Sequence, residues 1–310
     1  MRNKKSIASL FLMAILAVGV LAGCSSAASE KETTKESQMV TYQSEKGPVQ
    51  VPDQPKRVAV LASSYTGNLL SLGITPIAVQ DWEKANKFYG NKLDKVQVIT
   101  PDSTEKLLAL KPDLIIAFTT DKNLKKYQEI APTVAYSYEK YTYLQIHQEI
   151  GKLVGKEKEA KAWEDNWKKQ TAEAKTKVQA AIGTDATATV LETFGKELYV
   201  YGNNWGRGTE IIYQALGIKA PVKIEKDVFG TGYKAISSEV IPDYSGDYLF
   251  VGKGDATADN SYLETPLWKQ IPAVQKGNVF FFDSQSFYFN DPLSLEKELD
   301  FIVQSLTKGK

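Results

Sequence analysis

The residues of this 310-residue chain that are best suited to binding chemistry lie in one short segment, Tyr199 to Gly208. Trp205 and Arg207 stand two apart in it, among glycines that let the backbone turn sharply. An indole offers an apolar face, and a guanidinium donates several hydrogen bonds to oxygen atoms. The segment follows an expected strand and precedes an expected helix, where α/β folds place ligands. It therefore predicts a ligand-contacting loop, and the alternative is a loop that only caps the next helix.

The first 24 residues have the pattern of an export signal. A basic start at residues 2–5 precedes a short apolar segment, and the sequence Leu-Ala-Gly then leads to Cys24. The apolar core is shorter than the roughly 20 residues that a membrane-spanning helix needs. We therefore predict that residues 1–23 are a signal peptide and that Cys24 is lipidated. The alternative is a membrane-spanning N-terminal anchor, and both place the folded part outside the cytoplasm.

The composition excludes several kinds of chemistry. Cys24 is the only cysteine and His147 the only histidine, so disulfides, zinc or haem sites and histidine-dependent triads are disfavoured. Removal of residues 1–23 takes away three basic and no acidic residues, which changes the formal charge from +1 to −2. The mature chain keeps two arginines, Arg57 and Arg207. A binder of a polyanion is expected to use more guanidiniums, so a neutral or weakly charged ligand is predicted and nucleic acid is not.

The elements that must position these residues alternate along the chain. Strands are expected at 58–62, 114–118, 133–136 and 187–193, with helices between them, which is typical of a largely parallel sheet. Residues 156–182 contain neither Gly nor Pro and predict one long helix, about 40 Å in length. Such a helix resists bending, so only modest closure is expected. The predicted fold is α/β, with two Rossmann-like lobes joined by one long helix. Its parts are a tether (24–39), an N-terminal lobe (40–155), the connecting helix (156–182) and a C-terminal lobe (183–310).

At these residues the chain resembles a known family, the ferric-hydroxamate siderophore-binding lipoproteins of Gram-positive bacteria. These proteins serve ferrichrome and ferrioxamine importers and have the rigid-hinge fold. The resemblance covers essentially the whole mature chain, and its most diagnostic element is the Trp-Gly-Arg-Gly sequence at 205–208. The matching segments are 55–60 (PKRVAV), 111–116 (KPDLII), 131–134 (APTV), 201–208 (YGNNWGRG) and 288–292 (YFNDP).

The resemblance implies a binding cleft between the two lobes. Trp205 and Arg207 would line it from the C-terminal lobe with Tyr199 nearby, and Tyr138 would face them from the N-terminal lobe. Tyr288 would close one side, at a position where the family often has tryptophan, and this departure bears on ligand preference. Three hydroxamates fully coordinate Fe³⁺, so the resemblance implies no direct metal ligand, no intrinsic cofactor and no catalysis. The guanidinium would donate to the ligand oxygens while the rings cover the hydrocarbon.

The resemblance also implies the partners. Glu105 and Glu239, one in each lobe, match positions that dock onto basic residues of an ABC permease, which works with its ATPase. For Glu105 the alternative is a role in capping a helix after Ser103. The implied protein is a monomer, anchored by lipid on the outer face of the cytoplasmic membrane.

Other functions stay open at the level of sequence. The ligand could be ferric citrate or a ferric catecholate, or Fe³⁺ could be bound directly by phenolates, since the chain has 16 tyrosines. An exported hydrolase with paired carboxylates is an alternative of another class, although no Gly-x-Ser-x-Gly nucleophile motif is present. A structural lipoprotein without a small ligand is the fourth possibility.

Overall fold

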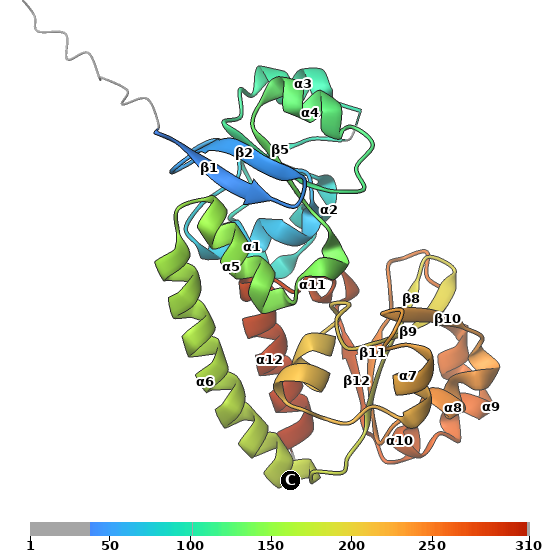
Figure 1. Ribbon diagram of the computed structural model, residues 1–310. Helices are drawn as coiled ribbons and strands as arrows, with labels where there is room; N and C mark the ends of the chain where they lie inside the picture. The colour runs from blue at the N-terminus through green and yellow to red at the C-terminus, as the bar shows by residue number, and fades with distance from the viewer. Residues whose placement is uncertain (1–37, 101, 309–310) are drawn as a thin grey trace, which may run out of the picture. The chain divides into compact units, whose positions relative to one another are not determined.

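A computed structural model describes residues 38–100 and 102–308 (Figure 1). The predicted signal peptide, the lipidation site Cys24 and the tether up to residue 37 lie outside these residues. In the described ranges, no helix has the length and apolarity required to cross a bilayer.

The N-terminal lobe is built on a parallel sheet of strand order β5-β4-β3-β6-β7. Its strands are β3 (Val58–Val60), β4 (Ala78–Val79), β5 (Gln97–Val98), β6 (Leu114–Phe118) and β7 (Thr133–Tyr136). The continuous apolar sequence of β6 is typical of a strand covered on both faces. Leu114 and Ile116 enter one core, and Ile115 and Ala117 enter the other.

Short helices and one hairpin cover this sheet. An antiparallel pair that the sequence patterns had not indicated, β1 (Met39–Ser44) and β2 (Gly47–Pro52), is fixed to β7 through the hydroxyl of Tyr42, 2.9 Å from that of Tyr136. The helices of the lobe are η1 (Ser63–Tyr65), α1 (Thr66–Ser71), α2 (Asp81–Lys84), η2 (Lys87–Tyr89), α3 (Thr104–Ala109), α4 (Leu124–Ile130), η3 (Tyr138–Lys140) and α5 (Tyr143–Leu153).

The C-terminal lobe has a mixed sheet, where a largely parallel one was predicted. Its order is β10-β9-β8-β11-β12, and β9 runs antiparallel to both neighbours. The strands are β8 (Ala188–Phe194), β9 (Glu197–Tyr201), β10 (Tyr233–Ile236), β11 (Tyr248–Gly252) and β12 (Val279–Phe282). The helices are η4 (Glu210–Ala215), α7 (Val222–Asp227), η5 (Ser238–Val240), α8 (Ile241–Tyr244), η6 (Ser261–Glu264), α9 (Pro266–Lys269), α10 (Pro272–Gln275), α11 (Ser284–Phe287) and α12 (Pro292–Thr307).

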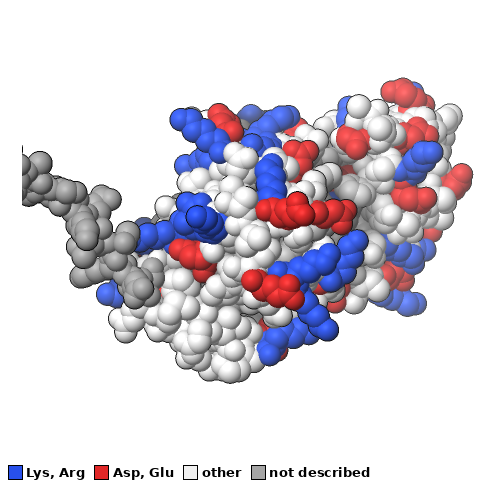
Figure 2. All heavy atoms as spheres, turned by 90° about the horizontal axis from the view of Figure 1, so that it is seen from above, with Lys and Arg blue, Asp and Glu red and all other residues white. Residues whose placement is uncertain are grey.

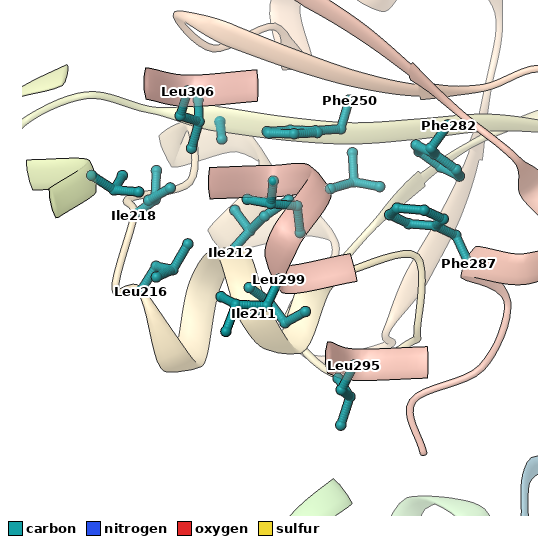
Figure 3. Packing of buried hydrophobic residues seen from close by; sticks show 14 of the residues in the cluster. Ile211, Ile212, Leu216, Ile218, Phe250, Phe282, Phe287, Leu295, Leu299 and Leu306 are labelled. Carbon is teal, nitrogen blue, oxygen red and sulfur yellow. The ribbon is translucent and has the colours of Figure 1, made fainter. Parts of the chain in front are cut away.

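One face of this sheet packs against η4 and α12. Figure 3 shows Ile211 and Ile212 of η4 beside Leu299 of α12, with Phe250 of β11 on the sheet side. The helix η4 has the wide π-type turn, with Leu216 N donating to Ile211 O at 2.8 Å. Phe287 lies in the same core, stacked on Phe282 at 4.9 Å. Core packing therefore holds both η4 and the segment after β12 on the sheet.

The predicted long helix is confirmed as α6 (Glu157–Ile182), which runs beside α12 in Figure 1. Trp163 and Trp167 stack at 5.5 Å on its inner side. Trp167 donates to the hydroxyl of Tyr143 on α5 at 3.0 Å, and Trp163 donates to Glu296 on α12 at 2.9 Å. The two indoles therefore attach α6 to elements of both lobes.

The lobes also meet directly through the last part of the chain (Figure 1). Tyr89 of η2 donates to the buried carboxylate of Asp291 at 2.7 Å, and Asn86 donates to Ser294 at 3.0 Å. Gly67 of α1 lies so close to Asp291 that a Cβ at this position would collide with the carboxylate. Residues 291–294, which the sequence had assigned to the C-terminal lobe, thus contact the N-terminal lobe.

One buried carboxyl near this junction has no partner among the described residues. Both oxygens of Glu298 on α12 are buried without a hydrogen bond. Burial raises the pKa of Glu298 well above its ordinary value, and the carboxylates of Glu210 and Asp291 raise it further. The folded protein therefore holds Glu298 in its protonated form.

We predict that Glu298→Gln raises the melting temperature more at pH 8 than at pH 5. In the unfolded chain this carboxyl titrates near 4.5. Above that pH the unfolded state releases the proton while the folded state keeps it, so wild-type stability falls as the pH rises toward the folded pKa. Glutamine does not ionise and escapes this loss. Thermal melts across pH 4–8 measure the difference.

Asp300→Asn, on the exposed side of the same helix, is the control, and its effect should not grow with pH. A gain for Glu298→Gln that is equal at pH 4 and pH 8 would contradict the assignment.

Candidate ligand-binding site

A cavity of about 450 Å³ lies between the two lobes. This is within the roughly 300–1,000 Å³ of small-molecule sites. Its lining residues are Ser63, Ser64, Phe118, Thr119, Thr120, Tyr136, Ser137, Tyr138, Glu139, Trp205, Arg207 and Tyr288.

The N-terminal wall of this cavity consists of residues that follow the parallel strands β3, β6 and β7. The carboxyl ends of parallel strands meet at one edge of a sheet, which is where open α/β sheets bind ligands. Hydroxyl groups of serine and threonine therefore lie close together here, and the hydroxyl oxygens of Thr119 and Ser137 are 2.9 Å apart. Tyr138 begins η3 and reaches across, with its ring 5.3 Å from that of Trp205 at 76°. The two predicted aromatics thus face each other from opposite lobes.

The C-terminal wall centres on Arg207, which is only 5% exposed. Its Nε donates to Glu192 Oε2 at 2.9 Å, and its Nη1 donates to the carbonyl of Trp205 at 3.1 Å. The guanidinium carbon lies 4.5 Å from the ring centroids of both Tyr201 and Tyr288. Two cation–π contacts therefore restrict the orientation of this group.

The protonation state of Arg207 follows from these neighbours. Burial opposes its charge, but the carboxylate of Glu192 outweighs this effect, and the pKa of Arg207 is raised. Among the residues that the structure describes, none accepts a hydrogen bond from Nη2. A charged donor therefore borders the cavity and can bind an oxygen atom of a ligand.

The backbone at Arg207 has a strained conformation. Gly206, Arg207 and Gly208 all have positive φ, at 67°, 59° and 76°, a conformation that costs energy for the arginine. The amide of Arg207 donates to Phe287 O at 2.5 Å, and a Cβ on Gly206 would collide with the carbonyl of Tyr288. Contact with the segment at 287–288 thus maintains the loop conformation.

Hydrogen bonds to the carboxylate of Glu210 link the same two segments. One of its oxygens accepts from the amide of Gly206 at 3.1 Å and from the side chain of Asn290 at 2.9 Å. The loop that carries Trp205 and Arg207 and the segment that carries Tyr288 are therefore parts of one hydrogen-bonded unit.

The cavity offers phenol groups but no metal-binding cluster of the usual kind. Burial raises the pKa of Tyr138 and that of Tyr136 well above the ordinary value, so both phenols keep their protons at neutral pH. Within the described ranges, no group of three or more His, Cys, Asp or Glu side chains could hold a metal ion. The site is suited to hydrogen bonding and aromatic contact.

Four of the predicted ligand residues, Trp205, Arg207, Tyr138 and Tyr288, line this one cavity. Tyr199 does not line it. Its ring contacts Tyr233 at 5.9 Å, and Tyr233 in turn contacts Trp205 at 4.9 Å. The pleat of β9 puts Tyr199 and Tyr201 on one face, and Tyr201 occupies the place beside Arg207.

The sequence patterns did not indicate Glu192, Tyr201 or the hydroxyl groups of the N-terminal wall as parts of the site. The hydroxyl groups could have been found, because each follows a predicted parallel strand. Glu192 could not, since an acidic residue in the middle of a strand shows no signal until its partner is known. The loop at 202–208 follows the antiparallel strand β9, so the rule for parallel strands does not explain its position. The ion pair between Arg207 and Glu192 accounts for the position of this loop.

The predicted docking residues lie apart from the cavity. Glu105 is exposed in the first turn of α3, and Glu239 is exposed in η5. The side chain of Ser103 makes no capping bond to α3. On the face in Figure 2, basic and acidic side chains are interspersed, and neither sign forms a continuous patch.

Two α/β lobes, one long connecting helix and a cavity between the lobes define a solute-binding protein of the rigid-hinge class. The periplasmic binding protein family matches residues 58–286, and the chain belongs to this family. Its members are binding proteins of ABC transporters, which confirms the prediction that the chain is not an enzyme.

Individual members of the family with high identity to this chain are iron(3+)-hydroxamate-binding proteins. The chain is 40% identical to the iron(3+)-hydroxamate-binding protein FhuD of Bacillus subtilis, with 98% of each chain covered. It is 34% identical to the iron(3+)-hydroxamate-binding protein YxeB of the same organism, covering 99% of this chain and 98% of the relative. The structure of Staphylococcus aureus FhuD2 with bound ferrioxamine B superimposes with a TM-score of 0.79 at 37% identity, covering 82% of this chain and 99% of FhuD2. These relatives confirm the resemblance found in the sequence.

We predict that Glu192→Gln lowers the free energy of unfolding by about 3 kcal/mol. The substitution keeps an oxygen near Arg207 and Tyr201 but removes the charge that balances a buried guanidinium, and breaking a buried pair typically costs this much. Urea denaturation followed by circular dichroism measures the change. Glu197→Gln, exposed on the same hairpin, should leave stability nearly unchanged. Equal stability of the two variants would show that Glu192 does not balance Arg207.

Proposed function

We propose that this chain is the substrate-binding component of a ferric hydroxamate siderophore importer and that it captures the chelate in the cavity between the lobes. The observation that carries the proposal is the arrangement of one clamped guanidinium, Arg207, opposite the ring of Tyr138 across a cavity of about 450 Å³. Two relatives that match over nearly the full chain are named iron(3+)-hydroxamate-binding proteins.

The chemistry of the ligand matches this cavity. A trihydroxamate neutralises and fully coordinates Fe³⁺, so its exterior presents carbonyl and hydroxamate oxygens together with hydrocarbon. Arg207 donates to the oxygens, and Trp205, Tyr138 and Tyr288 cover the methylene groups. The serine and threonine hydroxyl groups of the N-terminal wall supply further hydrogen bonds. No step breaks or forms a covalent bond.

The same features weigh against the other ligands. A tris-catecholate or citrate chelate carries several negative charges, whereas Arg207 is the one cation that lines this cavity among the described residues, and Glu192 already balances it. Direct binding of Fe³⁺ requires phenolates, and burial raises the pKa of Tyr138 well above its ordinary value, which makes release of its proton more costly. Ferric hydroxamates avoid both costs.

The lobe contacts support a small closing motion. The helix α6 joins both lobes through its two tryptophans, and the bond from Tyr89 to Asp291 holds them together a second time. Closure that separates these groups would break a buried hydrogen bond to a carboxylate. The ligand therefore enters a cleft that is largely formed beforehand.

Delivery requires an anchored protein and a docking surface. In this proposal Cys24 carries the lipid, and the domain acts on the outer face of the cytoplasmic membrane, as expected for relatives described as lipoproteins. Glu105 and Glu239 are exposed, so each is available to basic residues of a permease that works with an ATPase. The protein works as a monomer.

Titration of the soluble form that begins after Cys24 tests the ligand. We expect ferrioxamine B and ferrichrome to quench tryptophan fluorescence saturably, because Trp205 borders the cavity, and ferric citrate, a ferric catecholate and ferric chloride to fail. Trp205→Ala should weaken hydroxamate binding by about 1–3 kcal/mol, roughly 5–150-fold, when measured by calorimetry.

Val222→Ala, which removes a side chain that is 80% exposed, is the matched control and should bind as the wild type does. Saturable binding of citrate or catecholate alone would overturn the proposed ligand. Wild-type affinity of Trp205→Ala would overturn the proposed site.

We predict that Glu105→Lys combined with Glu239→Lys reduces siderophore uptake roughly tenfold while the affinity for the ligand is unchanged. Reversal of an exposed charge at a docking surface weakens association with the basic partner. Uptake is measured in cells whose only copy of the protein carries the substitutions. Glu173→Lys, on the exposed side of α6, is the control. Normal uptake by the double variant would exclude these residues from docking.

A further inference from the structure

A second, smaller hollow adjoins the cavity on the far side of Tyr288, which lines both. We call it the aromatic hollow and define it by Trp82, Phe194, Tyr288, Glu192 and Asp255, which line it. Trp82 belongs to α2 of the N-terminal lobe, whereas the other four come from the C-terminal lobe. The hollow therefore continues the interlobe cleft outward.

Aromatic rings form the hollow, and they are only partly covered. The ring of Trp82 lies 5.2 Å from that of Tyr288 and 6.1 Å from that of Phe194, with edge-to-face geometry in both pairs. Trp82 is 39% exposed and Phe194 is 44% exposed. Three rings at this spacing present π faces and edges that suit a methylene chain or a cation.

The charges that line the hollow are negative. Two carboxylates, Glu192 and Asp255, line it, and no lysine or arginine does among the described residues. Glu192 is balanced by Arg207, which leaves Asp255 as the exposed charge. Its Oδ1 accepts from the amide and the hydroxyl of Thr257 at 2.7 and 2.6 Å. Its Oδ2 accepts no hydrogen bond from the described residues, so this oxygen can receive a donor.

Cations near the hollow are engaged elsewhere. Lys253 places its ammonium 4.2 Å above the ring of Phe281, and Lys87 pairs with Asp283 at 2.5 Å. The guanidinium of Arg207, which is paired with Glu192, lies 4.5 Å from the ring of Tyr288 and 6.0 Å from that of Phe194. Among the described residues of the hollow, the ring of Trp82 and Asp255 Oδ2 are therefore the groups that can receive a further positive group.

The size of the hollow limits its occupant. It offers about 20 Å³, against about 450 Å³ in the cavity. The iron-bearing body of a chelate does not fit, but the end of one slender chain does. An occupant of the hollow must therefore be a pendant group of a ligand whose body lies in the cavity.

We propose that the aromatic hollow is a subsite for a cationic pendant group, a primary ammonium on an alkyl chain, carried by the bound ferric hydroxamate. The chain lies against Trp82 and Phe194, and the ammonium contacts the rings and Asp255 Oδ2. This inference rests on the function proposed above, since it requires a hydroxamate in the cavity. It makes Trp82 and Asp255 the residues that discriminate between hydroxamates with and without a terminal amine.

Ferrioxamine B, which ends in a primary ammonium, and its N-acetylated form, which is neutral there, provide the test. Their iron centres are identical, so the ratio of their dissociation constants isolates the pendant group. We expect the wild type to prefer ferrioxamine B roughly 5–10-fold at low salt, and the preference to shrink as salt screens Asp255. Trp82→Ala and Asp255→Asn should each reduce the ratio to near one while acetylated ferrioxamine B binds within about twofold of wild type.

Asp259→Asn, an exposed carboxylate on the same loop that does not line the hollow, is the matched control and should keep the preference. Equal binding of the two ligands by the wild type, or an unchanged ratio in both variants, would overturn the subsite but leave the proposed function intact. Failure of the wild type to bind either ligand would overturn the proposed function and the subsite with it.

Discussion

The buried ion pair between Arg207 and Glu192 is the interaction on which the binding site depends. A guanidinium that is 5% exposed is stable only beside a compensating charge, and Glu192 supplies it from the middle of β8. Tyr201 and Tyr288 each lie 4.5 Å from the guanidinium carbon and restrict its orientation. The pair thus brings together a strand, a strained loop and the segment after β12, and it leaves one donor directed at the cavity.

The same segment after β12 also links the lobes. Tyr288 borders the cavity, and three residues later Asp291 accepts the hydroxyl of Tyr89 from the other lobe. Along the opposite side, α6 and α12 are joined through Trp163 and Glu296. A binding wall and a lobe contact therefore share one short stretch of chain. The shape of the binding wall is therefore tied to the contact between the lobes.

Local patterns were most reliable where burial on both faces dictates composition. The apolar runs at β6 and β7 and the uninterrupted α6 formed within a residue of the expected positions. The hairpin β1–β2 and the strand β10 were not expected, because their side chains are half exposed and alternate weakly. The antiparallel direction of β9 in the C-terminal sheet was not predicted for a related reason. Strand direction depends on long-range pairing that local composition does not encode.

The sequence by itself determined the class of protein and the long connecting helix, and the distinctive run at 199–208 pointed to Trp205 and Arg207, because these depend on local propensity and local pattern. Tyr138 and Tyr288 were expected only from the resemblance to a known family. Tertiary structure alone decided how those residues are held. Glu192 became the partner of Arg207, and Tyr201, not Tyr199, lies against its guanidinium, through the pleat and the antiparallel course of β9. Such contacts join residues that are 15 to 208 positions apart in the chain. Their energies arise only when the folded backbone brings the groups together in a water-poor interior.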